Sequence, residues 1–128
     1  MVIVSHTSPY RLHTLFHPIH HQDSLHHNSD FLYADVVAHN IDSIREYFEK
    51  YFDLDHAQFV HNLICKEIAE LVRPIPHIHM IHMDCSYKFD NLLNCEPLYQ
   101  KHPGFQNHYN ELGNSLVSDA VKKRLAKI

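Results

Sequence analysis

His77 and His79 are the side chains whose type and spacing most directly suggest chemistry in this sequence. They stand two residues apart within residues 74–84, a short stretch bracketed by proline and aspartate in which the side chains alternate. That alternation predicts a buried β-strand, on which both imidazoles share one face with Ile81 and Met83. Two imidazoles on one face can hold a divalent ion, for which Mn²⁺, Mg²⁺ and Zn²⁺ are the candidates. The chain contains 15 histidines, so this pair is not specific by itself.

Residues 11–29 form a second group rich in histidine. His17, His20 and His21 have the spacing that places side chains on one face of a helix, and they are an alternative set of metal ligands. Pro18 argues against a helix interior at this point. We therefore favour a polar surface segment over a metal site here.

The overall composition excludes several classes of site. Gly104 and Gly113 are the only glycines, which excludes a Walker loop and a Rossmann fingerprint. The formal net charge of −4 gives no positive field for duplex DNA. The three cysteines show no C-x-x-C spacing, so they predict neither a disulfide framework nor a structural zinc site, and they fit a cytoplasmic protein. The sequence has no long apolar run of the kind that would suggest a membrane partner.

Hydrophobic periodicity predicts three strands and three helices. The expected strands are residues 1–5, 30–38 and 74–84, and the expected helices begin after Asn40 or Ser43, at Asp55, and at Asn114 or Ser115. Residues 87–113 are expected to be rich in loops. This order predicts an α+β fold in a single domain over residues 1–128, with a small mixed or antiparallel sheet and about three to four helices.

The helix expected from Asp55 carries a regular apolar stripe that includes Leu63 and Ile64. Such a stripe is typical of a helix that packs on a core. On that basis, replacing Leu63 or Ile64 by Ala is expected to cost about 2–5 kcal/mol.

Four segments, taken in order, resemble the ADP-ribosyltransferase fold. Residues 2–9 look like the first strand of that fold, and residues 31–35 look like its second conserved strand. Residues 79–84 look like the next core strand. Residues 120–128 look like the helix before its late catalytic strand. The resemblance implies NAD as cofactor and a target or mimicked target among host proteins.

The same resemblance implies roles for four residues. His6 would hydrogen-bond the nicotinamide ribose, Thr7 or Ser8 would line the nicotinamide pocket, and Tyr33 would stack on the nicotinamide ring. Thr7 stands where the family usually has glycine. The segment expected to bring the catalytic glutamate is missing, so the implied protein is a catalytically incomplete scaffold unless Glu111 or Asp119 replaces that residue.

A second resemblance concerns nucleic-acid chemistry. Pro76-His77-Ile78-His79 is similar to the metal-binding strand of HUH single-strand endonucleases, and residues 47–50 resemble their Y-x-x-K helix motif. It implies a metal-dependent single-strand DNA nickase with Tyr47 as the nucleophile. Nucleic acid is a partner only under this interpretation. Tyr47 also lies on the apolar stripe of its own helix, which is the structural alternative.

A third hypothesis needs no active site and no cofactor. Small acidic chains can act by occupying a protein partner, as inhibitors encoded by phages or other mobile elements and antitoxins do. Four aromatic residues in the expected loop region could anchor such an interface, namely Tyr87, Tyr99, Phe105 and Tyr109. Local packing of these rings is the alternative explanation.

Overall fold

A computed structural model describes residues 1–13, 30–104 and 108–127 of the chain. It divides into two compact units, each considered by itself below. The first unit comprises Met1–Pro9 and Phe59–Ile128, and the second comprises Tyr10–Gln58.

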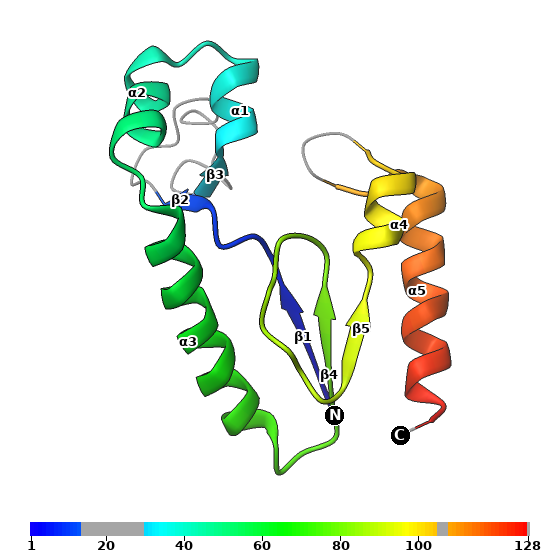
Figure 1. The fold of residues 1–128 in the computed structure, drawn as a ribbon. Helices are drawn as coiled ribbons and strands as arrows, with labels where there is room; N and C mark the ends of the chain where they lie inside the picture. The colour runs from blue at the N-terminus through cyan, green and yellow to red at the C-terminus, as the bar shows by residue number, and fades with distance from the viewer. Residues whose placement is uncertain (14–29, 105–107, 128) are drawn as a thin grey trace, which may run out of the picture. The chain divides into compact units, whose positions relative to one another are not determined.

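The first unit is built on a three-stranded sheet with the order β1-β4-β5 (Figure 1). The strands are β1 (Val2–His6), β4 (His77–Ile81) and β5 (Leu92–Asn94). Both pairs of strands are parallel, so the expectation of a mixed or antiparallel sheet was wrong for this sheet. The long connection between β1 and β4 is what permits a parallel pair.

The central strand β4 confirms the buried strand that its alternating sequence predicts. Ile78, His79 and Ile81 are buried, as expected for a central strand that is covered on both faces. In the register of β1 and β4, His6 lies opposite Ile81 and Val4 lies opposite His79. His6, His79 and Ile81 therefore share one face of the sheet.

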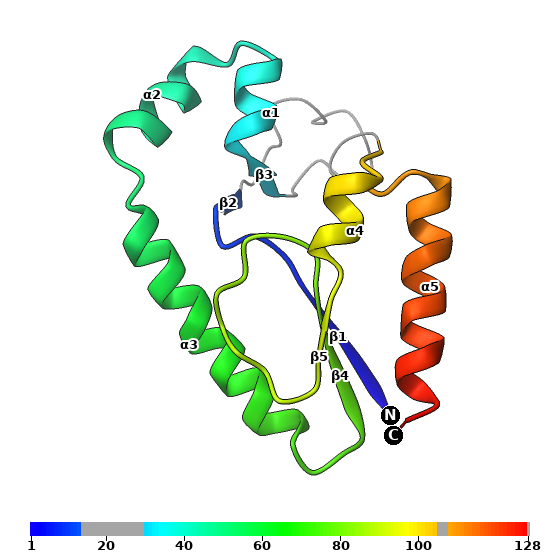
Figure 2. The ribbon, with the colours of Figure 1, turned by 45° about the vertical axis from the view of Figure 1, so that its right-hand side comes forward.

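Three helices belong wholly or partly to this unit: α3 (Leu54–Val72), α4 (Glu96–Lys101) and α5 (Glu111–Leu125). Figures 1 and 2 show α3 and α5 on either side of the sheet. The side chain of Asp53, rather than the expected Asp55, accepts a bond from His56 N at the start of α3. Asn110 caps α5 by accepting from Gly113 N, so this helix begins earlier than expected, within the predicted loop region.

The apolar stripe of α3 does not face the core. Leu63 and Ile64 remain 47% and 53% exposed, and Phe59, Val60 and Leu71 on the same side are exposed as well. The opposite side of the helix contacts the sheet through Cys65, which packs with Ile81 and Phe89. The stripe is long and regular, but the more buried side of the helix carries His61, Cys65 and Ala69 together with the half-buried Ile68 and Val72. The prediction that Leu63 and Ile64 are core residues was therefore wrong.

The second unit contains a two-stranded antiparallel sheet and two helices. Its elements are β2 (Arg11–His13), β3 (Asp30–Leu32), α1 (Tyr33–Ala38) and α2 (Asp42–Lys50). The strand expected over residues 30–38 ends at Leu32, and the rest of that stretch is helical. Val36 is buried in α1, which contacts α2. The apolar, β-branched sequence that suggested a strand here serves helix packing instead.

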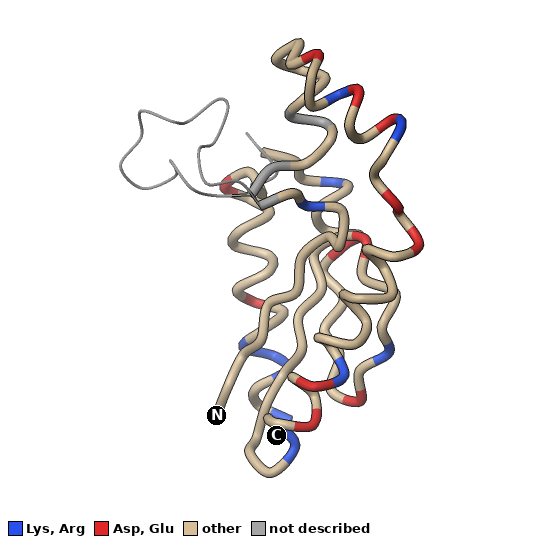
Figure 3. The backbone as a smooth tube through the Cα atoms, turned by 90° about the vertical axis from the view of Figure 1, so that its left-hand side faces the viewer, with Lys and Arg blue, Asp and Glu red and all other residues tan. Residues whose placement is uncertain are grey.

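The α+β class is confirmed, with five helices among the described residues rather than three to four. No described helix combines the length and apolar character needed to cross a bilayer. Figure 3 shows Lys and Arg interspersed with Asp and Glu, whereas β1 and β4 carry none of these residues. The chemistry available at the sheet is therefore that of histidine and cysteine.

Candidate metal centre

Helix α3 places two metal-ligating side chains side by side. His61 and Cys65 are four residues apart, so they lie on the same face of the helix, one turn apart. The distance from Cys65 Sγ to His61 Nδ1 is 3.7 Å, and to His61 Nε2 it is 3.9 Å. This face is the one that contacts the sheet, and Cys65 is only 1% exposed.

Cys85 completes a cluster of three ligands from the loop between β4 and β5. One ligand atom from each of His61, Cys65 and Cys85 lies within 4.8 Å of the other two. Asp84 adopts a left-handed backbone conformation with φ of 49° directly before Cys85. Aspartate tolerates this region better than most residues, and the turn it makes brings Cys85 back against the core next to Cys65.

A pair of buried histidines on the sheet joins this cluster. The Nδ1 atom of His6 lies 3.7 Å from Cys65 Sγ, and its Nε2 atom lies 2.9 Å from His79 Nδ1. Within the described part of the chain, the buried Nε2 atom of His79 has no hydrogen-bond partner. Phe89 stacks on both imidazoles, with ring centroids 4.4 Å from His6 and 4.0 Å from His79. A continuous polar chain therefore runs from His79 through His6 to Cys65.

Burial determines the protonation of these groups. It lowers the pKa of His6 from the ordinary 6.5 to about 4, and His79 and His61 add to the effect because a second positive charge nearby is unfavourable. Burial also lowers the pKa values of His61 and His79. At His61, a backbone hydrogen bond with Thr7 opposes this shift. At His79, the nearby His77 adds to the shift and Asp90 opposes it. The imidazoles are therefore neutral at pH 7 and keep lone pairs for a metal ion.

The thiol of Cys65 is protonated at neutral pH. Burial raises its pKa to about 12, and the neighbouring Cys85 adds to the effect because a thiolate there would lie beside a second sulfur. A metal ion binds the thiolate form, so it must displace this proton. The Cys65 thiol is consequently a weak nucleophile by itself. It can become a ligand when a metal ion displaces the thiol proton.

Two of the donor separations match those around a small tetrahedral ion. A Zn²⁺ ion binds sulfur at about 2.3 Å and nitrogen at about 2.0–2.1 Å, which places neighbouring ligand atoms about 3.5 Å apart. The measured separations of 3.7 Å from Cys65 Sγ to His61 Nδ1 and to His6 Nδ1 are close to that value. The group His61, Cys65 and Cys85 can thus hold a metal ion.

The structure does bring the predicted pair His77 and His79 together on one face, with ring centroids 5.0 Å apart. Each ring is engaged at one nitrogen: His77 Nδ1 lies 2.8 Å from Ile75 O, and His79 Nδ1 lies 2.9 Å from His6 Nε2. The predicted metal site at this pair stays a prediction. The alternative ligands His17, His20 and His21 lie outside the described residues.

The residues implied by the transferase resemblance fall in both units. His6 and Ser8 are buried and Thr7 is exposed in the first unit, whereas Tyr33 is exposed at the start of α1 in the second. Tyr33 donates a hydrogen bond of 2.8 Å to Glu49 Oε1. The proposed nicotinamide pocket and the transferase activity stay predictions.

The nuclease interpretation also stays a prediction. Tyr47, its expected nucleophile, lies on α2 in the second unit and is 40% exposed. Its ring contacts those of Phe48 and Phe52.

Three of the four aromatic residues proposed as partner anchors are described, and these are partly buried. Tyr87 packs edge-on against Phe89, and Tyr99 packs at a right angle against Tyr109. The hydroxyl of Tyr109 donates to Cys95 O and accepts from His82, whose other ring nitrogen lies 2.9 Å from Ser5 Oγ. Phe105 lies outside the described residues. Local packing accounts for the three described rings, and the protein partner stays a prediction.

Sequence reasoning missed His61, Cys65 and Cys85 as a group. The cysteines were judged by C-x-x-C spacing, but the signal in this chain is H-x-x-x-C on a predicted helix. That spacing could have identified His61 and Cys65. Comparisons of the chain with models of protein families, with curated proteins and with solved structures found no match.

Proposed function

We propose that the first unit is a zinc-binding module in which His61, Cys65 and Cys85 hold one Zn²⁺ ion, with His6 Nδ1 as the fourth ligand. The observation that supports the proposal is the convergence of three donor atoms within 4.8 Å in the core of the unit. Two sulfurs with imidazole nitrogens favour Zn²⁺ over Mg²⁺ or Ca²⁺, which prefer oxygen ligands.

The proposed centre is a structural one. It would tie α3, β1 and the loop after β4 together at the place where the helix contacts the sheet. Cys65 and His6 are buried, and four protein ligands leave no open position for a substrate. His79 would then act as the outer partner of His6, because a metal-bound Nδ1 leaves the Nε2 hydrogen of His6 to be donated to His79 Nδ1.

Metal analysis of the purified protein tests this proposal. We expect about one equivalent of Zn²⁺ after desalting, and Cys65→Ser should weaken binding by about 100-fold or more, because losing a ligand costs more than losing an outer partner. Cys95→Ser is the matched control, since Cys95 is also a buried free thiol but lies outside the cluster. It should retain the metal.

Two further measurements distinguish this centre from other sources of metal. With Co²⁺ in place of Zn²⁺, a tetrahedral thiolate site gives strong visible absorption, which Cys65→Ser and Cys85→Ser should abolish. His77→Ala should keep it. Retention of the full metal content in both cysteine variants would contradict the proposal and would point to the histidine-rich segment of residues 11–29. A mass lower by two hydrogens, reversed by reductant, present in Cys95→Ser and absent in both Cys65→Ser and Cys85→Ser, would show that Cys65 and Cys85 form a disulfide instead.

A further inference from the structure

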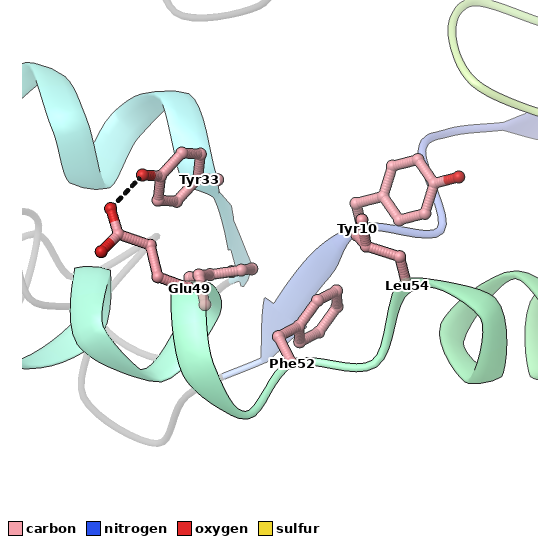
Figure 4. A pocket seen from close by; sticks show the side chains of 6 residues that line it. Tyr10, Tyr33, Glu49, Phe52 and Leu54 are labelled. Carbon is pink, nitrogen blue, oxygen red and sulfur yellow. Dashed lines mark hydrogen bonds between the residues drawn. The ribbon is translucent and has the colours of Figure 1, made fainter.

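The second unit contains an aromatic pocket that plays no part in the proposed metal centre. Its volume is about 430 Å³, which is within the usual range for a small-molecule site. The residues that line it are Tyr10, Tyr33, Phe48, Glu49, Phe52 and Leu54. Figure 4 shows Tyr33 and Glu49 on one side of this aromatic pocket and Tyr10, Phe52 and Leu54 on the other.

Several elements of the second unit supply these side chains. Tyr33 begins α1, Phe48 and Glu49 lie in the last turn of α2, and Phe52 follows that helix. Tyr10 directly precedes β2 and its hydroxyl donates to Gln58 Oε1. The pocket is therefore assembled from several parts of this unit by its own fold.

Three rings of the aromatic pocket, those of Tyr33, Phe48 and Phe52, are tilted relative to their neighbours. Tyr33 and Phe48 are 5.5 Å apart at 53°, and Phe48 and Phe52 are 4.8 Å apart at 47°. Tilted rings do not present two parallel faces, so they do not sandwich a flat ring such as nicotinamide. They suit a compact, rounded group that can touch several rings at once.

The charge of the lining is negative. Glu49 supplies a carboxylate at the edge of the aromatic pocket, turned toward the Tyr33 hydroxyl on the side away from Phe52 and Leu54 (Figure 4). No Lys or Arg is among the described residues that line the aromatic pocket. Glu49 is fixed by the hydrogen bond from the Tyr33 hydroxyl, which leaves it further lone pairs. The hydrogen bond to Glu49 raises the pKa of Tyr33, and the positive charge of Arg45 opposes that rise. The Arg45 guanidinium group is paired with Asp42 at 3.5 Å. Aromatic faces and a carboxylate both attract a cation.

We propose that the aromatic pocket of the second unit binds the trimethylammonium group of a small soluble molecule. The methyl groups contact Phe48, Phe52 and the two tyrosine rings, while the carboxylate of Glu49 balances the charge. A quaternary ammonium has no N–H to donate, so it loses little hydration on entering a site of this kind. Aromatic rings recognise such cations in general.

The direct test compares two ligands of the same shape that differ in charge. Choline and its neutral carbon analogue, 3,3-dimethylbutan-1-ol, are titrated separately into the full-length ¹⁵N-labelled protein. We expect choline to shift the amide signals of residues 33 and 48–54 at millimolar concentration. Its own methyl signal should move upfield in the ring currents. The neutral analogue should bind at least about tenfold more weakly than choline, because it lacks the cation–π interaction and the attraction to the carboxylate.

Two pairs of variants locate the site. Glu49→Gln should weaken choline binding about fivefold. Glu46→Gln is the control and should leave choline binding unchanged, because that carboxylate is paired with Lys50 on the same helix. Phe52→Leu should also weaken choline binding. Tyr51→Leu should leave choline binding unchanged, because it removes a neighbouring exposed ring that is not part of the lining. If Phe52→Leu unfolds the unit, the glutamate pair and the ligand pair still decide the matter.

Four outcomes would overturn the proposal. The first is equal binding of choline and the neutral analogue, which would make the pocket merely apolar. The second is an absence of shifts with choline up to tens of millimolar. The third is tighter binding of 1-methylnicotinamide, a flat cation, than of choline. Binding to phosphatidylcholine vesicles without binding of free choline would also overturn it, because the proposed source is a soluble molecule.

Discussion

Acidification from about pH 7 to about pH 4 is expected to lower the free energy of unfolding of the metal-free protein by about 3 kcal/mol through His6 alone. The pKa of His6 is lowered in the folded protein to about 4, while the unfolded chain takes up the same proton near the ordinary value of 6.5. Between these values the unfolded state binds more protons, so acid favours unfolding. This stability is fully present above pH 6.5 and is lost as the pH falls through 4.

The buried His79 and the half-buried His82 act in the same direction. Burial lowers the pKa values of His79 and His82, so each also protonates more readily in the unfolded chain. Asp90 partly opposes the effect at His79, since its carboxylate favours the charged imidazole. Protonation of His79 and His82 therefore adds to the loss of stability through His6.

Urea unfolding in the presence of a chelator, repeated at several pH values, measures this dependence. His6→Phe keeps an aromatic ring against Phe89 but removes the proton site, so the variant should depend less steeply on pH than the parent. His56→Phe is the matched control, because His56 is exposed near the start of α3 and lies outside the buried cluster. Identical slopes for the parent and His6→Phe would show that His6 is not the group that titrates.

The parts of the fold that sequence reasoning predicted correctly are those with long or sharply bounded patterns. The strand β4 combines alternation with flanking prolines, and α3 combines a long periodic stretch with a following Pro74. The strand expected at 30–38 failed because a short run of apolar and β-branched residues fits a strand and a packed helix equally well. Contact between α1 and α2 decides that case, and it is a tertiary effect.

The candidate site could be predicted only in part, because its residues are distant in the chain. His61 and Cys65 are neighbours by helical spacing alone. His6 and His79 are 73 residues apart, and only the parallel register of β1 and β4 brings them together. Cys85 depends on the turn at Asp84, which no local pattern specifies. The sequence thus contains one pair of the site but not the convergence that makes it a centre.

Replacing Ile78 by Ala is expected to lower the free energy of unfolding by about 2–5 kcal/mol, because it removes buried volume that the sheet cannot refill. Ile78 is fully buried in the central strand, opposite Ile3 of β1. Leu63→Ala is the contrasting change, since Leu63 is 47% exposed on α3 and keeps much of its area in water when the protein folds. It should cost less than about 1 kcal/mol.

Urea midpoints at a shared denaturant slope compare the two variants directly, with Ile64→Ala as a second exposed position on the same side of α3. The parent sets the reference, and the ranking is expected to be Ile78→Ala far below Leu63→Ala and Ile64→Ala. Equal losses at all three positions would mean that the exposed stripe of α3 is covered in solution. Repeating the titration over a range of protein concentrations would then show whether a second copy covers it, because only an intermolecular contact makes stability depend on concentration.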